Sequence, residues 1–208
     1  MFPERLAQGY RSFLGGRFAA EQDRYRDLAS TGQSPSIMVI GCVDSRVSPE
    51  VIFDAAPGEI LVARNVANLV PRYEAGGGQH GASAALEFAV RALRVRHIVV
   101  LGHAFCGGIK AFASNDAPLT ESDFIGKWMS QIAPAAEAIG APGDDPDDYL
   151  HKLEFASVEL SLKNLMTFPF VAVAVQKGEL SLHGAYFGVA SGRLLVRNPQ
   201  TGVFEPVA

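Results

Sequence analysis

Two cysteines and a histidine stand in equivalent places in two similar segments. Cys42 follows the apolar run of residues 37–41. His103 follows the similar run 98–102, and Cys106 lies three positions further on. Cysteine and histidine are zinc ligands, and three protein ligands leave a fourth position open, as in catalytic zinc sites. The spacing predicts one Zn²⁺ per chain, at which water with a pKa lowered to about 7 would supply hydroxide.

Asp44 and Arg46 directly follow the first proposed ligand, two positions apart. The planar guanidinium of arginine can form two parallel hydrogen bonds with a carboxylate. Asp44 held ionised in this way could accept a hydrogen bond from the hydroxide and orient it, whereas an unpaired Asp44 could itself bind the zinc. Such a pair is commonly only a surface ion pair, but its place beside a zinc ligand favours a catalytic role for both residues.

Length and composition narrow the class of protein. The 208 residues, 48% of them hydrophobic, fit one α/β domain. A net charge of −4 and the lack of a lysine and arginine cluster predict no nucleic-acid partner. No apolar run approaches the roughly 18 residues that cross a bilayer, and the first residues lack the apolar stretch of a secretory signal. We therefore expect no membrane partner and a cytoplasmic protein with reduced cysteines.

Four apolar runs without polar alternation predict the strands of a parallel sheet buried on both faces. They are residues 37–41, 60–63, 98–102 and 170–175. Parallel strands need crossovers, and the segments 79–93, 122–139 and 147–166 predict helices. Ligand sites of such sheets lie at the carboxyl ends of the strands, and we therefore expect Cys42 and His103 to meet there.

Further elements are predicted at both ends of the chain. Apolar and charged residues mix over 3–29 and predict helices with an apolar face, interrupted at Gly15 and Gly16. We expect residues 1–30 to form a helical arm that packs on a partner subunit, and residues 31–208 to form a single zinc-binding domain. Residues 180–196 predict a closing antiparallel hairpin. The fold class is α/β, a central mostly parallel sheet flanked by helices, with the N-terminal helical arm and C-terminal antiparallel strands.

The motifs together resemble the β-class carbonic anhydrases. The match rests on Cys42-x-Asp44-x-Arg46 and His103-x-x-Cys106, and it extends from about residue 33 to the C-terminus. The resemblance implies zinc-dependent reversible hydration of carbon dioxide to bicarbonate and a proton. It also implies that the two cysteines and the histidine hold the zinc, and that Asp44 and Arg46 form the catalytic pair.

The same resemblance implies a substrate pocket at the interface of a homodimer, or of a dimer of dimers. Gln33 would donate a hydrogen bond to carbon dioxide or bicarbonate, and Gly107 would offer its backbone N–H to the anion. Leu61, Val66 and Phe88 would line the pocket, with Leu61 and Phe88 in place of the aromatic residues of plant members. Gln33 and the apolar wall would come from the partner subunit.

One departure from the family pattern favours the plant-like type. Members with an inhibitory bicarbonate site carry a tryptophan where this chain has Val39, together with an arginine that matches Arg64. Arg64 and Asn65 are expected to organise the loop after the second strand. His80 could relay protons, but a place at the helix entry is favoured for it. Structural or surface roles are expected for His97, His151 and His183.

Two alternatives stay open. Relatives with the same zinc site hydrolyse carbonyl sulfide or carbon disulfide. A zinc or redox sensor would release its metal when Cys42 and Cys106 are oxidised. The pair Asp44 and Arg46 argues against the sensor, which would not need it.

Overall fold

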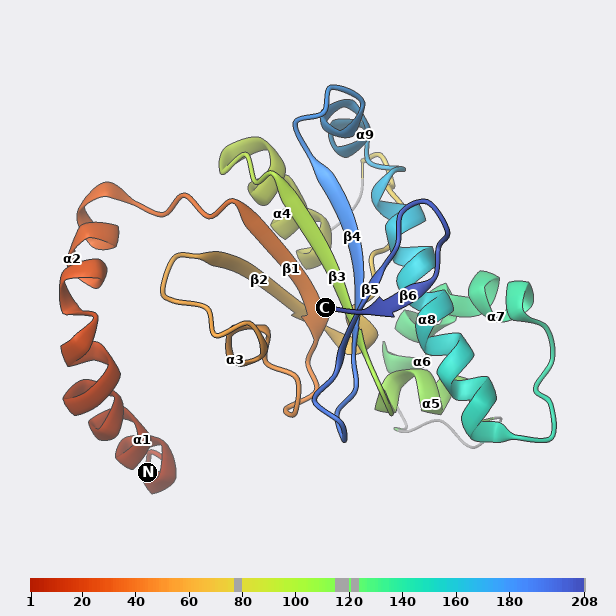
Figure 1. Ribbon diagram of the computed structural model, residues 1–208, viewed down its shortest axis with the longest axis horizontal. Coiled ribbons are helices and arrows are strands. Elements are labelled where there is room, and N and C mark those ends of the chain that lie inside the picture. The colour runs from red at the N-terminus through yellow and green to blue at the C-terminus, as the bar shows by residue number, and fades with distance from the viewer. Residues whose placement is uncertain (77–79, 115–119, 121–123, 208) are drawn as a thin grey trace.

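The computed structural model describes residues 1–76, 80–114, 120 and 124–207. A six-stranded sheet in the order β2-β1-β3-β4-β5-β6 forms its centre (Figure 1). The strands in chain order are β1 (Ile37–Cys42), β2 (Ile60–Asn65), β3 (His97–His103), β4 (Ser181–Phe187), β5 (Leu194–Arg197) and β6 (Phe204–Pro206). The first four strands in the sheet run parallel and the last two pairings are antiparallel. The predicted fold class is confirmed.

The register of β1 and β3 brings their carboxyl ends level. Gly41 on β1 pairs with Leu101 on the adjacent β3. Cys42 and His103 therefore leave neighbouring strands at the same end of the sheet. Both strands are apolar on each face because the sheet is covered on both, with Met38 and Val39 of β1 no more than 1% exposed.

One predicted strand was wrong. Residues 170–175 lie in helix α9 (Pro169–Gln176), and β4 is the fourth parallel strand. A short continuous apolar run does not distinguish a buried strand from a buried helix by periodicity. Pro169 was the informative residue, because proline is favoured in the first turn of a helix. The predicted hairpin is present between β4 and β5, but β4 also pairs with β3 on its other side.

The other predicted helices are present with changed bounds. The helix predicted over 79–93 is α4 (Gly81–Glu87), continued by a π-helical turn, Phe88–Ala92. Residues 77–79 and 122–123 lie outside the described part. The segment predicted over 122–139 consists of α6 (Phe124–Met129), a 3₁₀ turn and α7 (Ala133–Ile139), and the segment over 147–166 is α8 (Pro146–Leu165).

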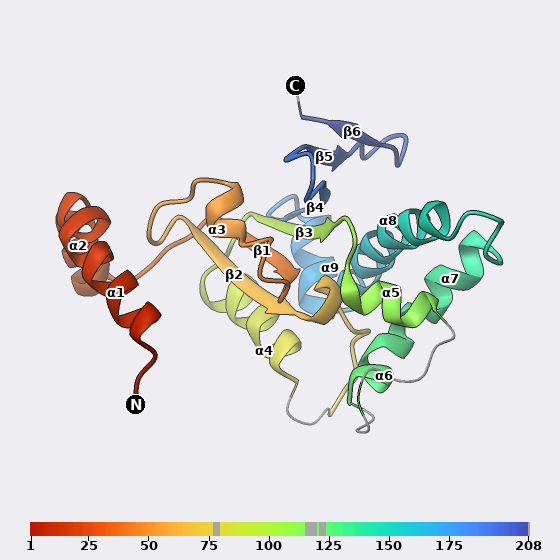
Figure 2. The same ribbon diagram turned by 90° about the horizontal axis from the view of Figure 1, so that it is seen from below.

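Helices cover both faces of the sheet, although unequally (Figure 2). α4, α8 and α9 pack on one face, where Ile98 and Val100 of β3 lie among their side chains. The short α3 (Pro49–Ile52) packs on the other face through Ile52. Among the described residues no single helix has the length and hydropathy of a membrane span. The helices α8 and α9 meet the two criteria only when they are taken together, and they are bent by 88° relative to each other.

A glycine lets α8 approach the sheet beside the predicted metal site. A Cβ on Gly102 would lie 2.7 Å from Cγ2 of Val158 on α8. Any side chain at this position would push the helix away from β3. The residue before His103 is therefore restricted to a very small one by packing, and α8 lies directly behind the site.

The N-terminal arm comprises α1 (Glu4–Phe13), a π-helical turn (Leu14–Phe18) and α2 (Gln22–Thr31). It extends from the body of the molecule (Figure 1), and neither helix has a buried residue. The two adjacent glycines fall within the π-helical turn, so the helical path continues through them. Arg17 in the π-helical turn and Arg24 in α2 donate hydrogen bonds to the carbonyl oxygens of Ala55 and Pro57. These bonds hold the arm against residues 55–57 of its own chain. The packing of the arm on a partner stays a prediction.

Candidate metal centre

Cys42, His103 and Cys106 converge at the carboxyl ends of β1 and β3. One ligand atom from each lies within 4.8 Å of the others, and the residues are 4%, 1% and 0% exposed. Cys42 ends β1, His103 ends β3, and Cys106 precedes α5 (Gly107–Ala113). The level ends of two adjacent strands and one tight turn thus gather all three side chains.

The His103 ring is oriented by its own turn. Its Nδ1 lies 3.0 Å from the carbonyl oxygen of Ala104, so Nδ1–H donates there, and in the neutral ring Nε2 carries the lone pair. Nε2 is buried without a hydrogen-bond partner. A buried polar atom of this kind is costly unless something satisfies it. Beside two free thiols, a nitrogen with an available lone pair completes the sulfur and nitrogen donor set that zinc prefers.

The Cys42 and Cys106 thiols lie close together, and each affects the pKa of the other. The Cys106 thiol, as hydrogen-bond donor, lowers the pKa of Cys42 to about 4 against the opposing effect of burial. The same interaction, together with burial, raises the pKa of Cys106. A divalent cation binds cysteine as the thiolate, so its binding at this pair would release protons.

Asp44 and Arg46 form a two-point ion pair next to the ligands. Arg46 Nε donates to Asp44 Oδ1 at 2.9 Å and Nη2 donates to Oδ2 at 2.7 Å. The Arg46 backbone N–H also donates to Oδ1, at 2.9 Å. These hydrogen bonds hold the pKa of Asp44 well below its usual range. The structure thus provides an oriented carboxylate that is ionised at neutral pH beside the metal centre, and its catalytic role stays a prediction.

Arg64 supports the loop after β1 from the neighbouring strand. Its Nε donates to the carbonyl oxygen of Cys42 and its Nη2 to that of Asp44, both at 2.7 Å. The expectation that Arg64 organises the loop after the second strand was wrong, because the parallel pairing directs it to the loop after the first. Asn65 does organise the loop after the second strand, since its side chain bonds the backbone N–H and C=O of Leu69.

Within a single chain, the residues predicted to bind substrate do not lie together around the metal centre. Val66 packs against the start of α5, which directly follows the ligand Cys106, since a Cβ on Gly108 would be 2.8 Å from its Cγ1. Leu61 pairs with Met38, near the opposite end of the strands. Ile37 and Cys42, the two ends of β1, are five steps apart, roughly 17 Å at about 3.3 Å per residue, and Gln33 comes before Ile37. Phe88 is 48% exposed. Their roles stay predictions.

The first residue of α5, Gly107, lies next to the last ligand. It is exposed, and a Cβ there would meet nothing within 4 Å. The backbone around it is therefore accessible, as its predicted contact with an anion requires.

The histidines outside the metal centre have other partners. His97 Nδ1 and His183 Nε2 lie 3.2 Å apart on the adjacent strands β3 and β4. Burial, with the charge of His97 second, lowers the pKa of His183. His151 Nδ1 lies 2.9 Å from the Tyr186 hydroxyl.

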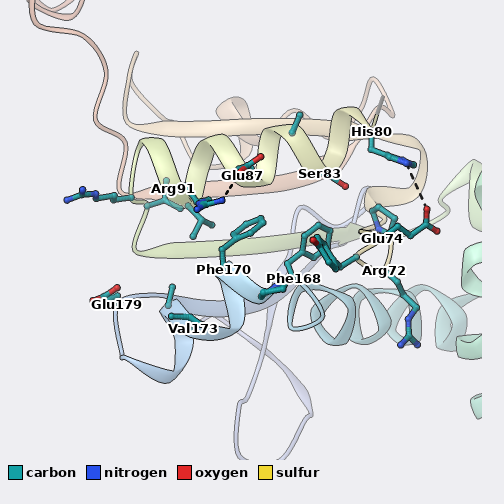
Figure 3. A pocket seen from close by; sticks show the side chains of 18 of the residues that line it. Arg72, Glu74, His80, Ser83, Glu87, Arg91, Phe168, Phe170, Val173 and Glu179 are labelled. Atoms are coloured by element: carbon teal, nitrogen blue, oxygen red, sulfur yellow. Dashed lines mark hydrogen bonds and ion pairs between the residues drawn. The ribbon is translucent and has the colours of Figure 1, made fainter. Parts of the chain in front are cut away.

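A groove of about 1250 Å³ lies between α4 and α9, away from the three ligands (Figure 3). Phe168 and Phe170 line it, and the Arg91 guanidinium lies 6.0 Å from the Phe170 ring centre. His80 lies at one end, 4.0 Å from Glu74. The ligands are not among its described lining residues, so this groove does not mark the reactive centre.

The comparisons with known proteins place this geometry in a family. Residues 37–194 match the family model described as carbonic anhydrase. β Carbonic anhydrase 3 of Arabidopsis thaliana is 37% identical over 194 residues, which cover 91% of this chain and 74% of that protein. β Carbonic anhydrase 5, chloroplastic, of the same plant is 36% identical over 184 residues, which cover 88% of this chain and 60% of that protein.

Solved structures agree with the sequence comparisons. The β-carbonic anhydrase CcaA matches with a TM-score of 0.88 at 28% identity, covering 99% of this chain and 92% of that chain. A Coccomyxa β-carbonic anhydrase in complex with acetazolamide matches with a TM-score of 0.80 at 30% identity, covering 98% of this chain and 86% of that chain. The chain belongs to the β-class carbonic anhydrases. Its reaction is the zinc-dependent reversible hydration of carbon dioxide to bicarbonate, and Cys42, His103 and Cys106 form a site able to hold the metal.

Proposed function

We propose that the carbonic anhydrase reaction of this chain takes place at a zinc ion on Cys42, His103 and Cys106, with Asp44 and Arg46 as catalytic residues. The observation that supports this most strongly is the buried, unpartnered Nε2 of His103 next to two thiols. Zinc, when bound, lowers the pKa of water to about 7 and so supplies hydroxide at neutral pH.

Asp44 orients the reacting water. Its two oxygens accept one guanidinium hydrogen bond each, and a carboxylate has further acceptor sites. One of these would accept a hydrogen bond from the water and turn its free lone pair toward carbon dioxide. Arg46 fixes the carboxylate by a two-point contact, which would favour Asp44 as an acceptor over Asp44 as a fourth ligand of the metal.

The substrate is uncharged and the product is an anion, and the proposed pocket suits both. Val66 offers apolar surface beside the ligand turn, and Leu61 and Phe88 would extend it. The backbone N–H of Gly107, exposed next to Cys106, would donate to bicarbonate. Gln33 would add a side-chain donor.

A second copy of the chain would complete the pocket, and the working unit is therefore a homodimer or a dimer of dimers. Strand β1 lies between Gln33 and its own ligand Cys42 in sequence, and Phe88 is half exposed. The arm has apolar side chains that the described chain does not cover, among them Leu6 and Tyr10, 57% and 60% exposed. The β-carbonic anhydrases of Sordaria macrospora, with a TM-score of 0.81 and 28% identity over 99% of this chain and 98% of that chain, are described as tetrameric.

A cytoplasmic location would suit the ligand set. Cys42 and Cys106 are both free, and a reducing compartment keeps such thiols available for metal.

Stopped-flow hydration of carbon dioxide, with zinc content measured on the same sample, tests the proposal. We expect one zinc per chain and hydration that disappears with the metal and returns with zinc. Cys106→Ser should lose both zinc and activity. Full zinc and full activity in that variant would refute the ligand set, and faster turnover of carbonyl sulfide or carbon disulfide than of carbon dioxide would refute the substrate.

A further inference from the structure

Glu154 is a buried carboxylate that contacts the backbone of a proposed metal ligand. It lies on α8 and is 2% exposed. Its Oε1 accepts a hydrogen bond from the backbone N–H of Cys106 at 2.9 Å. The reaction as derived above does not use this residue.

The other carboxylate oxygen is anchored separately. The hydroxyl of Tyr186, on β4 and 2% exposed, donates to Glu154 Oε2 at 2.5 Å. The same hydroxyl oxygen lies 2.9 Å from Nδ1 of the half-exposed His151. Because each oxygen of Glu154 has a donor from a different element, the carboxylate has little freedom to rotate.

The peptide that joins Phe105 to Cys106 is held from both sides. Its N–H donates to Glu154, and its carbonyl oxygen accepts from Arg46 Nη2 at 3.1 Å. Phe105 has a φ of 56°, which is unfavourable for a residue with a side chain. The two hydrogen bonds stabilise this turn and fix the plane from which the Cys106 side chain departs.

We propose that Glu154 is a positioning residue for Cys106. By holding the Cys106 N–H, it directs Sγ toward Cys42 and His103, and Tyr186 holds Glu154 in turn. The role rests on the proposed function, because it assumes that Cys106 binds the metal. Groups behind metal ligands orient them, and their loss typically weakens metal binding about 10- to 100-fold.

The test compares substitutions of Glu154 with a matched control on the same helix. Ser161 is 1% exposed, and its hydroxyl oxygen accepts a backbone N–H from Val70, as Glu154 accepts one from Cys106. Ser161→Ala therefore removes an equally buried acceptor that does not reach the metal centre. Glu154→Leu removes both acceptors, and Glu154→Gln retains one for Cys106 and offers an amide to Tyr186.

Two measurements apply to each variant: the rate of zinc release to a chelator, and the thiolate-to-cobalt charge-transfer spectrum of the cobalt-substituted protein. We expect Glu154→Leu to release zinc at least tenfold faster and to shift the spectrum. Glu154→Gln should stay within about threefold of the parent, and Ser161→Ala should match it. Release and spectrum in Glu154→Leu equal to those of Ser161→Ala would overturn the proposal.

A second variant keeps the test decisive if Glu154→Leu does not fold. Tyr186→Phe removes only the hydroxyl that anchors Oε2, and we expect zinc release about threefold faster or more. Unchanged release in Tyr186→Phe would then overturn the role of Glu154. A parent chain that fails to bind one zinc would instead refute the proposed function, so the two failures are distinguishable.

Discussion

Arg46 Nη2 donates a hydrogen bond to the carbonyl oxygen of Phe105 at 3.1 Å, although 59 positions separate the two residues in sequence. The guanidinium that pairs with Asp44 thereby also holds the turn between His103 and Cys106. The proposed acceptor for the reacting water and the turn that carries two ligands are joined through one side chain.

Arg46→Lys should reduce kcat/KM about 100-fold while zinc content stays at that of the parent, since a proton-accepting or orienting group contributes at least about this much. Lysine is a point charge and does not reproduce the two-point contact with Asp44. Stopped-flow hydration with metal analysis measures both quantities.

Arg91→Lys is the matched control for that substitution. Arg91 also pairs with a carboxylate, Glu87, at 3.0 Å, but on an exposed surface beside a groove that none of the three ligands lines. Exposed pairs contribute little, so kcat/KM should not change. Parental kcat/KM in Arg46→Lys with one zinc per chain would contradict the role of Arg46.

The stability of the chelator-treated protein should increase with pH between about 4 and about 8.5, the usual pKa of a thiol. The pKa of Cys42 in the fold is lowered to about 4, so folding favours its thiolate. That contribution is complete above the unfolded pKa and is lost as pH falls toward 4. Above about 8.5 the raised pKa of Cys106 works in the opposite direction.

Urea unfolding at several pH values measures this dependence, and Cys42→Ser provides the comparison. The free energy of unfolding should rise with pH in the parent by at most about 1.4 kcal/mol per pH unit from this one group. The serine variant should show a flatter dependence. Identical slopes in the two proteins would show that Cys42 is not ionised at neutral pH.

Mixing two impaired variants should restore activity if Gln33 acts on the partner subunit. In a mixed dimer of Gln33→Ala and Cys106→Ser chains, the zinc of the first chain would receive an intact Gln33 from the second. Random mixing gives such a site at about one quarter of all positions in a dimer. Stopped-flow hydration before and after co-refolding measures the gain.

The unmixed variants, refolded separately and then pooled, are the control for exchange between subunits. If Gln33 served the zinc of its own chain, no mixed dimer would contain a complete site. Activity of the co-refolded sample no higher than the sum of the two variants measured alone would therefore exclude the shared pocket.

Gly102→Ala should destabilise the protein by about 1–3 kcal/mol, as overpacking in a core does. The new methyl group would lie 2.7 Å from Val158, between α8 and β3. Gly143→Ala, whose methyl group would meet nothing within 4 Å, should have little effect. Denaturant unfolding measures both, and Val158→Ala should recover part of the loss in Gly102→Ala. Equal stability of the two glycine variants would contradict the close approach of α8.

The sequence predicted the parts of the site that depend on strand ends. Cys42 and His103 follow similar apolar runs, and parallel strands in register carry such residues to one edge. The pairing of Asp44 with Arg46 was predictable for a different reason, since their spacing is local. Neither required knowledge of the helices.

Residues that act across the fold were harder to predict. Glu154 meets Cys106 over 48 positions of sequence, and a glutamate in a long helix ordinarily faces solvent. One signal was available, because Leu150, Leu153, Ser157 and Val158 share its buried stripe on α8. Arg64 was harder to predict for a similar reason, since it meets the carbonyl oxygens of Cys42 and Asp44 over 22 and 20 positions. Its target depends on which strand lies beside β2.

The sheet stops on one side at β6, three residues long and ending in Pro206. Proline has no N–H to offer a neighbouring strand, and the preceding Glu205 adds a charge there. Features of this kind discourage uncontrolled strand addition and aggregation. The fold therefore protects this border against a strand of another chain, whereas the opposite border, the six-residue β2, contains no proline.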